Sequence, residues 1–283
     1  MISFGEDKYK PTLKAIWKLC FPMDTDSFID FYFDEIYKNE ETLVYLENGK
    51  PASAFQIIPY SLKNGTEIFQ AGYISGAMTH PDFRRKGLMK KILLASFDIM
   101  RERGFDYSFL IPQETWLFDF YEKFGYNTSK PVSLQAKRSE EPQSPDSQCW
   151  VYDGIAGQAR NDRTIYSIYS YFLSKIPQVI LKTEIQFKQI LQDFFDENGV
   201  LFTNEQGIAF TFKEENQIVV KEFFYQNQKV KEVFLKNIRD YYSQEKTVIL
   251  SSSDKLTGSR GMIKRLNDEM PEVLALYITM VLE

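Results

Sequence analysis

The sequence predicts a mixed α/β protein built from two domains of similar size. Its 283 residues exceed the length of about 150 residues that is typical of one domain. Helix-like and strand-like hydrophobic patterns run through the chain twice in the same order, although no sequence repeat is obvious. A polar stretch at 137–148, KRSEEPQSPDSQ, separates the two series. We therefore expect domains at 1–136 and 150–283, joined by a linker at 137–149.

In the first half, apolar residues at helical spacing predict helices, and apolar runs between turn residues predict strands. Asn48-Gly49 is a dipeptide typical of a tight hairpin turn, and Asn64-Gly65 predicts a second turn. The expected helices are Thr12–Cys20, Asp24–Tyr37, one that begins after Gly87 and one at about Glu114–Lys123, and the expected strands are Thr42–Leu46, Ala52–Ser61, Glu67–Thr79 and Tyr107–Ile111.

In the second half the same order recurs. Thr183 and Gln186 have the spacing of a capping box, which predicts a helix start at Glu184. The expected helices are Thr164–Ser174, Glu184–Phe195 and Val230–Tyr242, and the expected strands are Val200–Thr203, Gly207–Phe212, Gln217–Tyr225 and Thr247–Ser251.

Composition and charge exclude several classes of function. A net charge of -5 argues against a nucleic-acid partner, because phosphate binding needs a basic face, and it favours a cationic substrate such as an amine. With His80 as the one histidine and only two cysteines, a zinc site or a Ser-His-Asp triad is not expected, so we predict no metal. No signal sequence or membrane-length apolar run is present, which predicts a cytoplasmic protein without a membrane partner.

The segment Gly72–Lys91 holds the clearest chemical signal, because a strand leads through a short basic turn into a helix. Backbone N–H groups at a helix start have no intrahelical partners and the helix dipole is positive there, so such a turn binds a pyrophosphate. Gly87 allows close approach of the backbone to a ligand, and basic side chains add charged contacts. The expected cofactor-binding residues of this turn are Arg84, Arg85, Lys86, Gly87, Leu88, Met89 and Lys90.

The sequence HPDFRRKGLM in this turn resembles motif A of the GCN5-related N-acetyltransferase (GNAT) family, Arg/Gln-x-x-Gly-x-Gly/Ala. Arg84 and Gly87 match the motif, whereas Met89 replaces its small last residue. That departure and the doubled arginine are similar to the Eis-like branch, whose members have a second, degenerate acetyltransferase-like domain. They commonly end in a sterol-carrier-like domain, for which this sequence leaves no room. The resemblance implies the acyl-CoA N-acyltransferase (GNAT) fold in two tandem domains and acetyl-CoA as co-substrate.

In that family, two neighbouring parallel strands diverge and the pantetheine arm lies between them, bonded to free backbone groups. The resemblance places Ala77, Met78 and Thr79 on the strand that receives it. Gly72 and Gly76 in the same strand predict a bulge or a close approach of the backbone.

Tyr121 is the expected catalytic residue. The segment FYEKFGY at 120–126 resembles the family's F-Y-x-x-x-G-F/Y sequence, whose tyrosine points at the cofactor sulfur. Attack of an amine on the thioester expels a thiolate, and a phenol can donate a proton to it. The commoner fate of a tyrosine is simple packing, which is the alternative for this residue.

The acceptor amine also needs a base. A lysine-like amine has a pKa of about 10.4, so about one molecule in 2,500 is neutral at pH 7, which corresponds to about 4.6 kcal/mol. Four carboxylates are candidates, with no choice among them: Glu114, Asp119, Glu67 and the C-terminal carboxylate of Glu283.

The sequence therefore predicts a direct transfer of acetyl from acetyl-CoA to a primary amine of a small molecule or peptide, without a covalent enzyme intermediate. The second half has no equivalent turn, because Tyr225–Val230 contains neither glycine nor arginine, so one cofactor site is expected. A homo-oligomer is compatible with the sequence. Two alternatives stay open: a non-catalytic acyl-CoA-binding module, and a tRNA-dependent aminoacyltransferase of tandem GNAT type.

Overall fold

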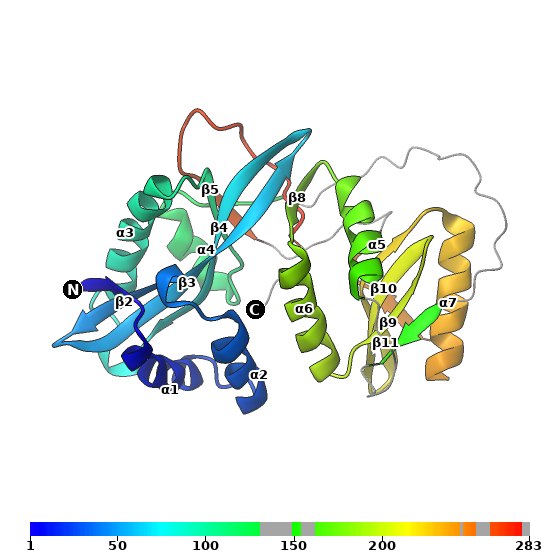
Figure 1. Ribbon diagram of the computed structural model, residues 1–283, viewed down its shortest axis with the longest axis horizontal. Coiled ribbons are helices and arrows are strands. Elements are labelled where there is room, and N and C mark those ends of the chain that lie inside the picture. The colour runs from blue at the N-terminus through cyan, green and yellow to red at the C-terminus, as the bar shows by residue number, and fades with distance from the viewer. Residues whose placement is uncertain (131–148, 154–161, 244–245, 253–260, 279–283) are drawn as a thin grey trace. The chain divides into compact units, whose positions relative to one another are not determined.

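The computed structural model describes residues 1–130, 149–153, 162–243, 246–252 and 261–278 (Figure 1). The chain divides into two compact units. Each has its own sheet and its own helices, so the predicted mixed α/β class is confirmed. None of the described helices has the length and apolar character needed to span a bilayer.

The boundary between the units differs from the predicted domains 1–136 and 150–283. Residues 1–129 form the first unit together with 261–274, which the sequence assigned to the second domain. The physical reason is strand β13 (Met262–Arg265), which pairs antiparallel with β5 (Tyr107–Leu110) and so covers its edge. All but the last residue of the predicted linker 137–149 lies outside the described residues.

The sheet of the first unit has the strand order β1-β2-β3-β4-β5-β13-β6. Neighbouring strands are antiparallel except for β4 and β5, which are parallel. Asn48 and Gly49 have φ angles of 50° and 76°, as a two-residue hairpin turn requires, so the predicted turn is confirmed. The remaining strands are β1 (Ile2–Phe4), β2 (Thr42–Glu47), β3 (Lys50–Asn64), β4 (Glu67–Thr79) and β6 (Asn127–Thr128).

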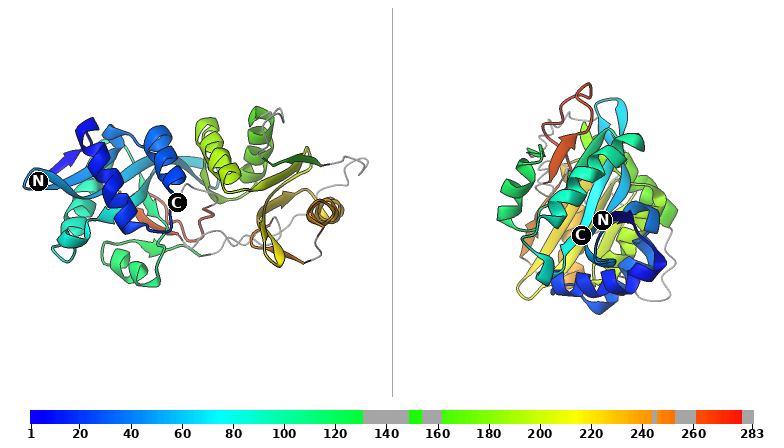
Figure 2. Two further views of the ribbon diagram at one scale, coloured as in Figure 1. Left: turned by 90° about the horizontal axis from the view of Figure 1, so that it is seen from below. Right: turned by 90° about the vertical axis from the view of Figure 1, so that its left-hand side faces the viewer.

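Helices cover both faces of this sheet (Figures 1 and 2). Helix α1 packs on β3 and β4 from one face, and α3 packs on β2, β3 and β4 from the other. Helix α3 does so because its apolar residues recur at helical spacing, with Ile92, Leu93 and Met100 fully buried. The α-helices are α1 (Lys10–Cys20), α2 (Asp26–Phe31), α3 (Leu88–Glu102) and α4 (Thr115–Glu122), a π-helical segment η2 (Tyr32–Ile36) follows α2, and short 3-10 segments are η1 (Asp7–Tyr9), η3 (Asn39–Glu41) and η4 (Pro81–Phe83).

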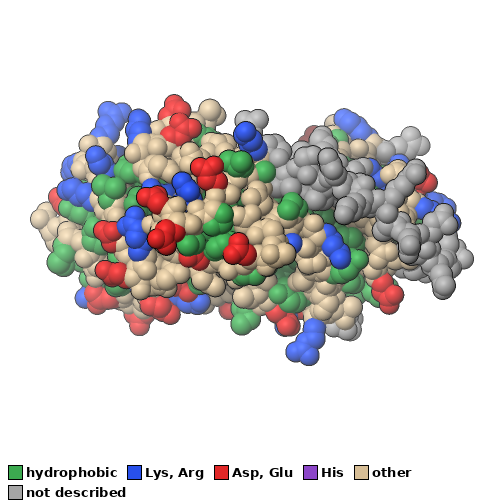
Figure 3. Space-filling model, turned by 90° about the horizontal axis from the view of Figure 1, so that it is seen from above, with side chains coloured by type: hydrophobic (Ala, Val, Ile, Leu, Met, Phe, Trp, Pro, Cys, Tyr) green, Lys and Arg blue, Asp and Glu red, His purple; other side chains and the backbone are tan. Residues whose placement is uncertain are grey.

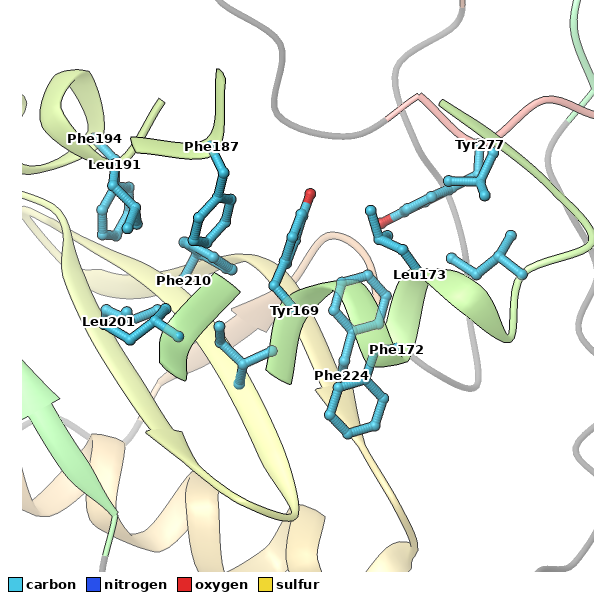
Figure 4. Packing of buried hydrophobic residues seen from close by; sticks show 14 of the residues in the cluster. Tyr169, Phe172, Leu173, Phe187, Leu191, Phe194, Leu201, Phe210, Phe224 and Tyr277 are labelled. Atoms are coloured by element: carbon cyan, nitrogen blue, oxygen red, sulfur yellow. The ribbon is translucent and has the colours of Figure 1, made fainter. Parts of the chain in front are cut away.

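The sheet of the second unit has the strand order β12-β11-β10-β9-β7, with β11 and β12 parallel. Its two faces carry separate cores, one under α5 and α6 and one under α7. Figure 4 shows the first of these, with Tyr169 and Phe187 stacked at 4.6 Å between ring centroids. The elements are β7 (Trp150–Tyr152), α5 (Asp162–Ser174), β8 (Gln178–Leu181), α6 (Glu184–Asp196), β9 (Val200–Asn204), β10 (Gly207–Glu214), β11 (Gln217–Tyr225), α7 (Gln228–Tyr242) and β12 (Thr247–Ile249).

Candidate active site

Strands β4 and β5 separate after a short parallel pairing. Their register runs only from Ala71↔Tyr107 to Tyr73↔Phe109. Strand β4 continues to Thr79 on its β3 side, while β5 ends at Leu110. Along 74–79, no strand in the described part of the chain pairs with the β5 side of β4. The free backbone groups of this edge can therefore bond to an extended ligand.

A β-bulge lies in β4 where the strands diverge. The β3–β4 register shifts between Ala54 and Gln56, opposite Gly76, which has a φ angle of 60°. A Cβ atom on Gly76 would overlap the indole ring of Trp17. Gly76 therefore serves both the backbone conformation and the approach of Trp17, as the sequence predicted for a glycine in this strand.

Gly72 has a different role in the same strand. A Cβ atom there would lie 2.8 Å from Sδ of Met100, which belongs to α3. The absence of a side chain at Gly72 lets α3 pack closely on the sheet, so this glycine fixes the position of the helix rather than forming a bulge.

A cleft of about 90 Å³ opens between the diverging strands. Its walls come from α1 and the loop after it, from β4, from the end of β5 with the loop that follows, and from α4. The lining residues are Trp17, Phe21, Asp24, Tyr73, Ile74, Ser75, Gly76, Ala77, Leu110, Ile111, Pro112, Gln113, Leu117 and Tyr121.

Tyr121, the predicted catalytic residue, projects from α4 into the lining of this cleft. Its side chain is 5% exposed and packs edge-on against Phe120 and Tyr126. The hydroxyl makes no hydrogen bond to any described residue, and burial raises the pKa of this phenol to about 12. Tyr121 is therefore protonated throughout the neutral range and has a free donor.

The predicted pyrophosphate turn joins β4 to α3 through η4. Arg85 and Gly87 have φ angles of 64° and 73°, and Gly87 is the N-cap residue of α3 without a side-chain cap. The N–H groups of residues 85–90 donate to no group in the described part of the chain. A Cβ atom on Gly87 would meet nothing within 4 Å. The turn thus presents unpaired donors and open space at the positive end of a helix.

The side chains of the turn fall into two groups. Arg84 is turned back onto the strand, because its Nε donates to the Thr79 carbonyl at 3.2 Å and its Nη2 lies 3.6 Å from Sγ of Cys20. Arg85 and Lys90 are exposed and form no hydrogen bond or ion pair with the described residues. Nζ of Lys86 lies 4.7 Å from the ring centroid of Phe83. Arg84 therefore fixes the turn, and the other three cations are available to an anion.

Two of the remaining predicted turn residues have their side chains in the core. Leu88 is buried, and Met89 packs against the cluster under α3. Only their backbone N–H groups face the space of the turn. This packing of the Met89 side chain accounts for a large residue at the position where the family motif has glycine or alanine.

The three strand residues predicted for the pantetheine arm lie at the end of β4, but only Ala77 lines the cleft. Met78 is buried, and its carbonyl accepts a hydrogen bond of 2.9 Å from Ser53 Oγ. The Thr79 carbonyl accepts from Arg84 and from Cys20. The backbone groups at 78 and 79 are thus partly engaged within the protein.

The three predicted base candidates that lie within the described residues, Glu114, Asp119 and Glu67, do not line the cleft. Glu114 and Asp119 are exposed, and Glu114 accepts a hydrogen bond of 2.6 Å from the indole of Trp116. Glu67 begins β4 at the end opposite the divergence. Glu283 lies outside the described residues.

Asp24, which the sequence reading did not single out, is the carboxylate in the cleft lining. It follows α1 in a short loop, and its Oδ2 accepts a hydrogen bond of 2.6 Å from Nε1 of Trp17. Burial raises the pKa of this carboxyl, although the bond from Trp17 acts in the opposite direction. Nothing in the local pattern marks Asp24, since it stands at the start of a predicted helix.

His80 has a local role. Its Nδ1 accepts a hydrogen bond from the backbone N–H of Asp82 at 3.3 Å and so closes the η4 turn. Within the described ranges, no group of three or more His, Cys, Asp or Glu side chains could hold a metal ion.

Comparisons with known proteins agree with this geometry. Residues 2–129, almost the whole continuous part of the first unit, match the family model described as an acetyltransferase (GNAT) domain. Residues 2–129 therefore form a GNAT acetyltransferase domain, which makes up somewhat less than half of the chain. No curated protein sequence matches the chain.

Solved structures share the fold over most of the chain. A GCN5-related N-acetyltransferase from Anabaena variabilis is similar with a TM-score of 0.70 at 15% identity, covering 94% of this chain and 73% of that one. Eis1 from Mycobacterium abscessus is similar with a TM-score of 0.70 at 11% identity, covering 95% and 74%. A probable N-acyltransferase from Enterococcus faecalis is similar with a TM-score of 0.70 at 11% identity, covering 94% of this chain and 72% of that one. The resemblance to an Eis-like fold is confirmed, and the two sheets are consistent with tandem GNAT-like domains.

Proposed function

We propose that this chain is a cytoplasmic N-acetyltransferase that moves acetyl directly from acetyl-CoA to a primary amine of a small molecule or peptide. The observation that carries the proposal is the divergence of β4 from β5, with the hydroxyl of Tyr121 unbonded in the cleft between them. The hydroxyl brings a free donor into the cleft, and the resemblance to the family's F-Y-x-x-x-G-F/Y sequence implies that this tyrosine points at the cofactor sulfur.

The residues present fit acetyl-CoA. The N–H groups of residues 85–90 and the side chains of Arg85, Lys86 and Lys90 would hold the pyrophosphate. The free edge of β4 near Ala77 would bond to the amide groups of the pantetheine arm. Arg84 would act indirectly, because its bond to the Thr79 carbonyl holds the turn against the strand.

Tyr121 would supply a hydrogen bond to the sulfur as negative charge develops on it. Its pKa of about 12 lies above that of a thiol, which is about 8.5, so complete transfer of its proton to a free thiolate would be uphill. The hydroxyl can instead pass one proton to sulfur while it receives another from the nitrogen that has attacked. Its raised pKa suits that exchange, because the phenol is never lost to ionisation at neutral pH.

The test combines binding and turnover. Calorimetry with CoA and a thiol-release assay with acetyl-CoA and a panel of amines should show binding and amine-dependent release of CoA. Binding of CoA without release by any amine in the panel would favour the non-catalytic acyl-CoA module. Absence of CoA binding would contradict the proposal.

A tRNA-dependent aminoacyltransferase is the less favoured alternative. On the face drawn in Figure 3, basic and acidic side chains are interspersed rather than gathered into a basic surface. Strong, salt-sensitive retention of tRNA by the protein would favour this alternative, because phosphate contacts are lost steeply as salt rises.

A further inference from the structure

The cleft contains one charged side chain among its described lining residues, the carboxylate of Asp24. The other walls are aromatic or aliphatic, or carry neutral polar groups such as Ser75 and Gln113. An unbalanced carboxylate in such a cleft attracts a cation, and aromatic faces add to the attraction.

The position of Asp24 is fixed through Trp17. The Trp17 indole is 4% exposed and lies at 4.4 Å from the Tyr32 ring, with Gly76 leaving room for it on β4. Its Nε1 then donates to Oδ2 of Asp24, and the backbone N–H of Asp24 donates to the Phe21 carbonyl. Oδ1 of Asp24 accepts no hydrogen bond from the described residues. One oxygen is therefore oriented by the fold, and the other is free.

We propose that Asp24 binds the ammonium group of the acceptor through this free oxygen and takes its proton before the attack on acetyl-CoA. The acceptor class is then an alkyl or arylalkyl ammonium that is charged at neutral pH. This inference rests on the proposed function, and it assigns the base that the sequence left open among Glu114, Asp119, Glu67 and Glu283.

The proton and electron balance is complete with these groups. The ammonium loses one proton to Asp24 and becomes a neutral amine. Its lone pair forms the N–C bond, the C–S bond breaks, and that electron pair goes to sulfur. The second nitrogen proton reaches sulfur through the Tyr121 hydroxyl, and Asp24 releases its proton to solvent.

The surroundings of Asp24 favour this transfer. Burial raises the pKa of the carboxyl, which makes it a stronger base than a surface aspartate. The same apolar walls disfavour the ammonium form of the acceptor, so the two pKa values move toward each other.

The test uses Asp24→Asn, in which the amide oxygen can still accept the Trp17 hydrogen bond while the charge is removed. Asp26→Asn is the matched control, because Asp26 stands two residues further on, pairs with Lys18 at 2.5 Å, and is outside the cleft. Two acceptors of similar shape are compared at pH 7: benzylamine, which is charged, and O-benzylhydroxylamine, whose amino group is neutral.

Asp24→Asn should lower kcat/KM for benzylamine by about 100-fold or more, the range of a general base, and leave O-benzylhydroxylamine almost unchanged. The control should match the wild type with both acceptors. Equal losses with both acceptors would mean that Asp24 is only structural and would overturn the proposal, as would an unchanged rate with benzylamine.

Calorimetry separates this inference from the proposed function. The wild type and both variants should bind CoA equally. Benzylammonium should bind to the wild type and to Asp26→Asn, but not to Asp24→Asn. A wild type that binds CoA but not benzylammonium contradicts the role of Asp24 and leaves the cofactor site intact. A wild type that does not bind CoA contradicts the proposed function itself.

Discussion

The parallel strand pairs of the two units begin alike and end differently. In the first unit, β4 and β5 pair from Ala71 to Tyr73 and then diverge around the cleft. In the second unit, β11 and β12 pair from Ile218 to Val220, and the pairing continues as Leu250 donates to the Val220 carbonyl and Phe223 donates to the Ser251 carbonyl. A bridge between Phe223 and Ser252 extends it further. The edge that is free in one unit is therefore bonded in the other.

The helix that connects the two strands of each pair shows the same contrast. Helix α3 starts at Gly87 with no side-chain cap and with unpaired N–H groups. Helix α7 starts at Asn227, whose Oδ1 accepts from the N–H of Val230 at 3.1 Å. A capped helix start has fewer unpaired N–H groups to donate to an anion. The cap at Asn227 therefore stabilises α7 rather than forming an anion site.

The buried polar groups complete the comparison. Glu222 lies just past the paired residues of β11, and its Oε1 accepts a hydrogen bond of 3.0 Å from the Tyr277 hydroxyl. Figure 4 shows Tyr277 packed within the core of this unit. Tyr121 has an unbonded hydroxyl in a cleft, whereas Tyr277 has a bonded hydroxyl in a core. One shared pattern of elements can thus yield a cofactor cleft or a closed core, depending on which backbone edges and helix ends are bonded internally.

The largest expected effect separates these two tyrosines. Tyr121→Phe should lower kcat by about 100-fold or more, since general acid catalysis typically contributes 10² to 10⁴, with CoA binding retained. Tyr277→Phe should leave kcat unchanged and lower the free energy of unfolding by about 1–3 kcal/mol, because Glu222 loses a partner. Thiol-release kinetics and urea unfolding measure the two effects. If Tyr121→Phe turned over a good acceptor as fast as the wild type, that result would contradict the role of Tyr121 as proton donor.

The second effect concerns the buried Lys182 and Glu222, which have no counterpart in the cleft of the first unit. Burial lowers the pKa of Lys182 and raises that of Glu222. Lys182→Met should destabilise the protein by about 1–3 kcal/mol, because the buried Glu222 carboxyl loses the Coulomb attraction of the Lys182 ammonium, although no hydrogen bond joins the two described side chains. The double variant with Glu222→Gln should recover much of that loss.

The pH dependence of Lys182→Met follows from the same pair. Without the lysine, the pKa of Glu222 rises further above its unfolded value of about 4.3. The folded state then holds a proton that the unfolded state has released, so the stability of this variant should fall as pH rises from about 4.3 through the raised pKa. Urea unfolding at several pH values measures the slope. A loss of stability toward acid pH in this range would contradict the assignment.

The third effect tests the helix start of the first unit. Gly87→Ala should raise the KM for acetyl-CoA about tenfold, or about 1.4 kcal/mol, because the Cβ enters the open space in front of the N–H groups. Gly104→Ala is the matched control, since Gly104 has a φ angle of 78°, equally open surroundings, and lies just past the other end of α3. Both should lose about 1–2 kcal/mol of stability from the strained backbone. An equal rise in KM for both variants would show that the turn is not the binding site.

The features that the sequence predicted well are those with local causes. Strand β4 and the start of α3 after Gly87 follow from apolar patterning and a turn glycine, and both have the predicted bounds. Strand β13 was missed because it has four residues and its partner β5 lies far away in the chain. Short strands of this kind are defined by the edge they complete, which a local pattern does not contain.

The site was only partly predictable for a similar reason. Tyr121 and the turn carry a family-like motif, so they could be named from the sequence. Asp24 becomes part of the cleft only because Gly76 admits Trp17, which then orients the carboxylate. Arg84 was expected at the ligand from its charge and from its match to the motif, but the sequence did not predict its hydrogen bond to the Thr79 carbonyl. Roles that depend on two or three tertiary contacts leave no periodic signal in the chain.

The smallest expected effect lies at the helix start of the second unit. Asn227→Ala removes the cap of α7, so it should lower the free energy of unfolding by about 1 kcal/mol. Turnover and CoA binding should stay at wild-type values, because the described turn has no open glycine and the strand edge beside it is bonded. Asn227→Asp, which keeps a capping oxygen, should restore the stability. A loss of CoA affinity in Asn227→Ala would mean that the second unit takes part in binding, and the contrast between the two helix starts would then no longer distinguish a cofactor site from a closed core.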